Sequence, residues 1–269
     1  MNIDEVKKYY NENSDLDFEL NVRQGLLKSG FDVKHSGRYV DDFTGKMREY
    51  DLLATPRSRV INGMTARSAF DYLELAVEYK HIAEDCPLII GARDCEYEKC
   101  FSMHYVRDNS TTLTAYVRDI KIEQMASLYN AFGKYFSEQI GVEVMQMARG
   151  GQERKIKPLE SNSAIYDKWS QAINHAIYRY RKIASEISIG STNGTITVWC
   201  QPILVVPNGR LYIANRDDER LTVNEAEGIN IKVDYDFSIN AVAGENSKIS
   251  SYFLFTESGF IKFTSMFQG

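Results

Sequence analysis

The sequence predicts an α/β sandwich with a mixed central sheet. Strand-like segments occupy most of residues 31–81, and a long amphipathic helix over 163–186 precedes an apolar strand over 195–207. The composition supports a folded domain, since 43% of the 269 residues are hydrophobic and 26% are charged. Disordered and low-complexity classes are thereby excluded.

Helical signals come first along the chain. Residues 3–11 predict a short helix, and Ser14 or Asp15 can cap a second one. Gly30 stands where a helix commonly ends on a glycine. Between the cap and this glycine, apolar residues recur at helical spacing: Phe18, Val22, Leu26 and Leu27.

Three strands are predicted next. The segments 31–40 and 47–54 have strand composition and flank the turn residues 41–45. Between 71 and 81, apolar and polar residues alternate, which is the period of a strand. The segment 56–69 is expected to be a polar loop or a loose hairpin extruded between the second and third strands.

Beyond these strands the sequence predicts a mixture of short elements. The C-terminus is expected to close on a hairpin with strands at 251–256 and 260–264 around a turn at 257–259. We expect one domain over 1–206 and a C-terminal extension of small strands over 207–269, packed on that domain. The remaining expectations are a short strand at 87–90, a helical insertion at about 100–160 with its helix at 120–140, and a linker at 145–160.

The net charge and the apolar runs of the sequence limit the functional classes to which the protein can belong. The net charge is −5, which argues against a protein that coats nucleic acid, although basic residues concentrate between 149 and 182. No apolar run approaches the roughly 20 residues that span a bilayer, and the charged start does not resemble a secretory signal. The four cysteines are too few and too clustered for a disulfide framework. We therefore expect a cytoplasmic protein that does not bind a membrane.

Two acids and a lysine occur near the ends of neighbouring predicted strands. Asp51 lies in the second strand, while Glu78 and Lys80 share one face of the third because strand side chains alternate. If these strands pair, Asp51 and Glu78 together with the carbonyl of Tyr79 supply hard oxygen ligands suited to Mg²⁺. A lysine beside the ion can help to orient and deprotonate a metal-bound water.

This pattern resembles the PD-(D/E)xK nuclease superfamily, which has the restriction-endonuclease-like fold. Glu19 on the preceding helix and the step from Gly30 to Phe31 are similar to the Holliday-junction-resolvase branch. The segment 39–51 resembles a loop of uncharacterised bacterial members. No proline precedes Asp51, since Tyr50 stands there, and this absence is common in the family.

The resemblance implies a restriction-endonuclease-like α/β/α sandwich that hydrolyses phosphodiester bonds with Mg²⁺ or Mn²⁺. It implies products that carry 5′-phosphate and 3′-hydroxyl groups. Asp51 and Glu78 would be metal ligands, Lys80 the catalytic lysine, and Glu19 an auxiliary ligand or orienting residue. The alternative is a catalytically inactive module that keeps the fold to bind nucleic acid or a protein partner.

DNA is favoured over RNA as the substrate, with a role in restriction, repair or anti-phage defence. A homodimer and a partner protein that supplies specificity or activation are compatible with this class. Gln171, with Lys168 and His175 nearby, can face the site, although a polar helix face is the favoured interpretation. Further candidates for substrate contact are Arg48, Arg154, Lys155 and Lys157. The alternative is that these residues are solvated or only support the site.

A second set of residues has spacing close to that of a zinc finger: Cys86, Cys95, Cys100 and His104. A Cys₃His tetrahedron would form a structural clip or an RNA-contacting knuckle. Free cysteines are favoured instead, because residues 87–90 have the composition of a buried strand.

Overall fold

The structure is a computed structural model that describes residues 2–7, 16–41, 44–57, 60–61, 64–65, 72–82, 86–94, 104–107, 139–150, 155–158, 163–189, 195–217, 220–238 and 246–267. Its labelled helices are α2 (Leu16–Lys28), α4 (Ser163–Ile189) and α5 (Glu257–Ser265). Its strands are β1 (Phe31–Val40), β2 (Met47–Pro56), β3 (Val60–Ile61), β4 (Met64–Thr65), β5 (Tyr72–Tyr79), β6 (Leu88–Asp94), β7 (His104–Arg107), β8 (Gln139–Gly150), β9 (Lys155–Pro158), β10 (Thr195–Val206), β11 (Leu211–Asp217), β12 (Arg220–Glu225), β13 (Gly228–Ser238) and β14 (Asn246–Thr256).

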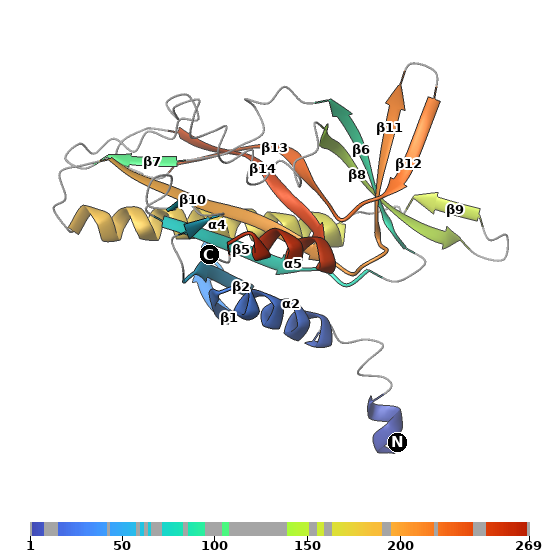
Figure 1. Ribbon diagram of the computed structural model, residues 1–269, viewed down its shortest axis with the longest axis horizontal. Coiled ribbons are helices and arrows are strands. Elements are labelled where there is room, and N and C mark those ends of the chain that lie inside the picture. The colour runs from blue at the N-terminus through green and yellow to red at the C-terminus, as the bar shows by residue number, and fades with distance from the viewer. Residues whose placement is uncertain are drawn as a thin grey trace.

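A mixed sheet organises the molecule, as Figure 1 shows. Within the described residues twelve strands are joined in the order β1-β2-β5-β10-β14-β13-β8-β6-β11-β12, with β7 on β10 and β9 on β8. The strands β1, β2 and β5 are antiparallel neighbours, whereas β10 runs parallel to both β5 and β14. The predicted α/β class with a mixed sheet is therefore confirmed.

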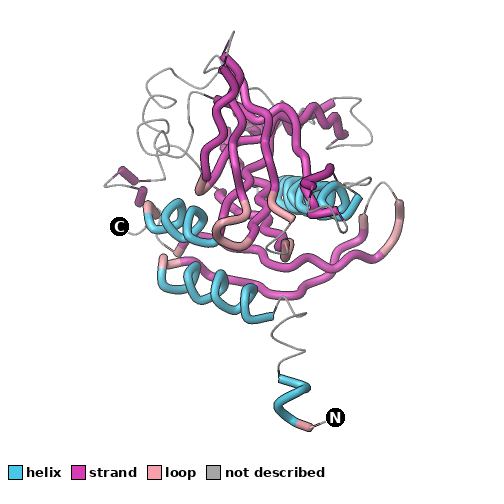
Figure 2. The backbone as a smooth tube through the Cα atoms, turned by 90° about the vertical axis from the view of Figure 1, so that its right-hand side faces the viewer, coloured by secondary structure: helices cyan, strands magenta, loops and turns pink. Residues whose placement is uncertain are grey.

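Helices cover both faces of the sheet around β5 (Figure 2). Leu75 and Val77 of β5 pack with α2 and α5, while the intervening Ala76 packs under α4. This alternation follows from strand geometry, because successive side chains point to opposite faces. β5, the strand that carries Glu78, is therefore covered by buried apolar side chains on both of its faces.

Most elements of the first 82 residues lie where the sequence predicts them. The helix α2 and the strands β1, β2 and β5 match the predicted helix and three strands within a few residues. Gly30 and Gly45 have positive φ values of 81° and 65°, which suits their places after α2 and in the β1–β2 turn. The small antiparallel pair β3–β4 confirms a hairpin in the extruded segment.

The later elements β6, α4 and β10 also confirm their predictions, but the linker predicted at 145–160 is wrong. Residues up to Gly150 belong to β8, which pairs antiparallel with β6, and β9 follows it. The missing side chain of Gly141 lets β8 approach Ile231 and Ile90 closely. The helix predicted at 120–140 lies outside the described residues up to 138, and residues 139–140 begin β8.

The predicted C-terminal hairpin is also wrong, because residues 257–265 form the helix α5. Thr256 caps it by accepting a hydrogen bond from the N–H of Gly259 at 3.2 Å. Phe260 and Phe263 are one helical turn apart and are fully buried against the sheet. Gly259 packs against the backbone of Glu227, so it serves close packing and not a turn.

Strands from both sides of residue 206, the predicted end of the first domain, belong to one hydrogen-bonded sheet. β14, from the segment 207–269, lies between β10 and β13 and so occupies the middle of the strand order. Within the part of the chain that the structure describes, no helix is long and apolar enough to cross a membrane.

The residues of the suggested zinc site are only partly described. Cys86 is half-buried against the apolar cluster that contains Leu88. His104 begins β7 on β10, while β6, which follows Cys86, pairs with β8 and β11. Cys95 and Cys100 lie outside the described residues, so the zinc site stays a prediction.

Candidate active site

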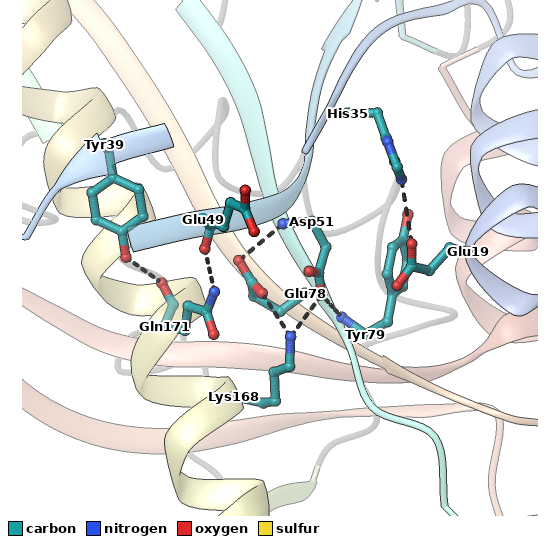
Figure 3. Close-up of polar contacts among 9 residues, drawn as sticks. All are labelled: Glu19, His35, Tyr39, Glu49, Asp51, Glu78, Tyr79, Lys168 and Gln171. Atoms are coloured by element: carbon teal, nitrogen blue, oxygen red, sulfur yellow. Dashed lines mark hydrogen bonds and ion pairs between the residues drawn. The ribbon is translucent and has the colours of Figure 1, made fainter. Parts of the chain in front are cut away.

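The strands β2 and β5 bring Asp51 and Glu78 together. Their backbone pairing runs from Ala54↔Leu75 to Leu52↔Val77, which sets Asp51 opposite Glu78 at the next position. At this position each of the two carboxylates accepts a hydrogen bond from the backbone of the other strand (Figure 3). The Asp51 carboxylate oxygen Oδ2 accepts the N–H of Tyr79 at 2.8 Å, and Glu78 Oε1 accepts the N–H of Asp51 at 3.4 Å. Each carboxylate is therefore fixed by the strand that carries the other.

Lys168 of α4 places its ammonium between the two carboxylates. Its Nζ atom is 3.0 Å from Asp51 Oδ2 and 3.4 Å from Glu78 Oε2. The Glu78 side chain is 0% exposed, that of Asp51 18% and that of Lys168 28%. One cation thus faces two carboxylates at the edge of the buried core, and the cluster is accessible from the Lys168 side.

Burial and charge shift the pKa values of this cluster. Burial, followed by the nearby Asp51 carboxylate, raises the pKa of Glu78 well above its usual value. Burial lowers the pKa of Lys168, but the charges of Asp51 and Glu78 outweigh it and raise that pKa overall. Lys168 therefore stays charged, whereas an ionised Glu78 is costly. A site of this kind favours additional positive charge.

Polar contacts hold α4 in register with β2. The amide Nε2 of Gln171 donates to the backbone carbonyl of Glu49, and the hydroxyl of Tyr39 donates to the carbonyl of Gln171 at 3.4 Å. One helical turn further, the His175 ring stacks on Tyr50 at 4.1 Å and on Tyr39 at 5.5 Å between ring centroids. Gln171 therefore lies beside the site and contacts the strand backbone two residues before Asp51 (Figure 3).

Glu19 lies on α2, close to the site but turned toward β1. Its Oε2 atom is 3.3 Å from Nε2 of His35. Figure 3 shows Glu19 pointing toward His35, with the ring of Tyr79 nearby. Within the described part of the chain the buried Tyr79 hydroxyl has no hydrogen-bond partner. Burial, followed by the charges of Asp51 and Glu19, raises the pKa of that phenol. The structure thus places Glu19 with His35, and its auxiliary role stays a prediction.

The lysine that contacts both carboxylates is Lys168, whereas the sequence favoured Lys80. Lys80 directly follows β5, its backbone N–H donates to the carbonyl of Val205 at 3.0 Å, and its side chain is half-exposed. A signal for Lys168 is present in the sequence. Polar residues recur at helical spacing along one side of α4, and each meets a group of β2 or β5: Lys168, Gln171, His175 and Arg179.

The other residues predicted to contact substrate are placed differently. Arg48 pairs with the buried carboxylate of Asp41 in the β1–β2 turn, at 3.4 Å. Lys155 and Lys157 belong to β9, which pairs with β8 on the other half of the sheet from β2 and β5. The structure therefore does not bring these two lysines to Asp51, and Arg154 lies outside the described residues.

The donor set of this site fits Mg²⁺ or Mn²⁺. Among the residues that the structure describes, no three or more His, Cys, Asp or Glu side chains gather as a metal-binding group. Mg²⁺ does not need such a group, because it is commonly held by one or two carboxylates together with water and substrate phosphate. Asp51 and Glu78 meet that requirement, and the ammonium between them shows that the position accepts a cation.

Comparisons of the chain with protein-family models, curated proteins and solved structures give no match. What can be said about function therefore depends on the fold and on the cluster of Asp51, Glu78 and Lys168.

Proposed function

We propose that the protein is a metal-dependent nuclease with the restriction-endonuclease-like fold, and that it hydrolyses phosphodiester bonds in nucleic acid. The observation that carries this proposal is the pair of carboxylates on neighbouring strands, Asp51 and Glu78, sharing one cationic group from α4. DNA is favoured over RNA, in a restriction, repair or defence role. A homodimer would allow each subunit to cut one strand, and a partner protein would supply specificity.

The order of elements supports this choice of fold. In chain order, a helix, three antiparallel strands, a long helix and a parallel strand occur as α2, β1, β2, β5, α4 and β10, with β3 and β4 inserted before β5 and β6 to β9 inserted before α4. The two acids lie on the second and third of these strands, as the resemblance to the PD-(D/E)xK superfamily requires. Helices on both faces of β5 and β10 are consistent with a sandwich.

Asp51, Glu78 and the carbonyl of Tyr79 would hold the ion. When bound, Mg²⁺ or Mn²⁺ lowers the pKa of a coordinated water and offsets the charge that develops on the phosphodiester. The N–H of Tyr79 fixes the Asp51 carboxylate. Lys168 takes the role that the resemblance implies for Lys80: its ammonium can bind a non-bridging phosphate oxygen or orient the attacking water. Gln171 keeps α4, and with it Lys168, in register with β2.

The test is an incubation of the pure protein with plasmid, linear and single-stranded DNA and with RNA, with and without Mg²⁺ or Mn²⁺. We expect metal-dependent cleavage that Asp51→Asn and Glu78→Gln each lower by on the order of 1,000-fold, since metal stabilisation amounts to several kcal/mol. Glu225→Gln, an exposed acid on β12, is the matched control and should leave cleavage unchanged. Cleavage that persists in Asp51→Asn, with folding intact, would refute the assignment.

A non-catalytic binding module is the second candidate. It is favoured by the observation that backbone N–H groups and Lys168 already bond to both carboxylates and fix them. This candidate predicts that wild-type protein cleaves no substrate with either metal. It also predicts that Asp51→Asn binds nucleic acid as tightly as wild type in a mobility-shift titration.

A further inference from the structure

The oxygens that would face a metal ion are already engaged with Lys168. Asp51 Oδ2 accepts both the N–H of Tyr79, at 2.8 Å, and the ammonium of Lys168, at 3.0 Å. Glu78 Oε2 lies 3.4 Å from the same ammonium, and Glu78 Oε1 is directed to the N–H of Asp51. The space between the two carboxylates is therefore the space that the Lys168 ammonium occupies.

A divalent cation and this ammonium cannot both occupy that space. Mg²⁺ binds carboxylate oxygens at about 2.1 Å, so an ion shared by Asp51 and Glu78 would lie where the ammonium now makes its contacts. Two cations in contact at this place would repel each other strongly, because the buried Glu78 leaves little water to screen them.

We propose that Lys168 is a built-in counter-ion of the metal site: a divalent cation binds to Asp51 and Glu78 only by displacing the Lys168 ammonium. The displaced side chain then remains beside the ion, where it can contact a substrate phosphate. This inference rests on the proposed function, which requires that the two carboxylates bind a divalent cation.

The structure lets Lys168 move without moving the helix. Its side chain is 28% exposed and has a flexible four-carbon stem, so the ammonium has a path toward solvent. The helix α4 is held separately, by Gln171 on the carbonyl of Glu49 and by the stack of His175 on Tyr50. In the metal-free protein the ammonium lowers the repulsion between Asp51 and the buried Glu78, which keeps the site formed.

The direct test is acetylation of lysines by an amine-reactive reagent, followed by mass spectrometry of the full-length protein with and without Mg²⁺. We expect labelling of Lys168 to rise about tenfold at saturating Mg²⁺, because losing ion pairs worth about 1.4 kcal/mol is a factor of ten. Lys182, exposed on the same helix, is the internal control and should not change.

Binding of Mn²⁺, measured by calorimetry, completes the test. Lys168→Met should bind Mn²⁺ about tenfold more tightly than wild type, since the competing charge is gone. If wild type binds Mn²⁺ through Asp51 but Lys168 labelling does not change, the inference fails and the proposed function stands. If neither wild type nor Lys168→Met binds Mn²⁺, or if binding persists in Asp51→Asn, the proposed metal site itself is refuted.

Discussion

His175 should make the protein sensitive to acid. This histidine of α4 is 0% exposed, and both of its ring nitrogens are buried without a hydrogen-bond partner among the residues that the structure describes. The rings of Tyr39 and Tyr50 stack against it, and Arg179 is the charged group that acts on it. Burial, followed by the charge of Arg179, lowers the pKa of His175 to about 3.

The size of the effect follows from the difference between the folded and unfolded pKa values. An unfolded histidine has a pKa of about 6.5, so between pH 6.5 and pH 3 the unfolded chain binds a proton that the folded protein does not. The depressed pKa of His175 therefore contributes stability that is complete above pH 6.5 and is lost as the pH falls. Between pH 7 and pH 5 the free energy of unfolding should drop by about 2 kcal/mol from this residue alone.

The variant His175→Phe tests this reasoning. Phenylalanine keeps a ring between Tyr39 and Tyr50, loses no hydrogen bond and cannot be protonated. Urea unfolding of wild type and variant at pH 7 and pH 5 should show that wild type loses about 2 kcal/mol more than the variant. His81→Gln, an exposed histidine, is the control and should behave as wild type. Equal losses in wild type and His175→Phe would refute the buried, neutral state of His175.

Three further substitutions have defined outcomes. Because burial raises the pKa of Glu78, ionisation of this side chain destabilises the metal-free protein as the pH rises. Glu78→Gln cannot ionise, so its Tm should be higher than that of wild type at pH 8. The difference in Tm should shrink at pH 4, where Glu78 of wild type is protonated. Glu74→Gln breaks a buried bidentate pair with Arg179, at 2.6 Å, and should lower the free energy of unfolding by about 3–5 kcal/mol in urea titrations. Gly37→Ala would place a methyl group against the phenol of Tyr50 and should cost about 1–3 kcal/mol, measured in the same way; an unchanged Gly37→Ala protein would contradict that contact.

The parts of the fold that the sequence predicted are those with a clear periodic pattern. α2 and α4 each bury one face, so their apolar residues repeat with the helical period, whereas in β5 the polar residues Glu74 and Glu78 alternate with Leu73, Leu75 and Val77 at the period of a strand. The sequence did not predict α5, because the phenylalanines of residues 260–264 are also typical of a strand and Gly259 is typical of a turn. Only the packing shows that Thr256 caps a helix and that Gly259 lies against Glu227. β8 was missed because its pairing with β6 is a long-range contact.

The candidate site was predicted in part for the same reason. Asp51 and Glu78 could be placed together because β2 and β5 follow each other in the chain and pair as neighbours. Lys168 arrives from 90 residues beyond Glu78, and the face of α4 that meets these strands is set by tertiary packing. The signal available in the sequence was the helical periodicity of α4, which places Lys168 on the face directed toward the sheet.

The most direct measurement is a crystal structure of the protein grown with Mn²⁺, with anomalous difference maps collected at the manganese edge. Our account predicts a single strong peak within coordination distance of the Asp51 and Glu78 carboxylates, and the Lys168 ammonium moved away from both. A map without a peak at this position, with Lys168 still between the two carboxylates at saturating Mn²⁺, would contradict it.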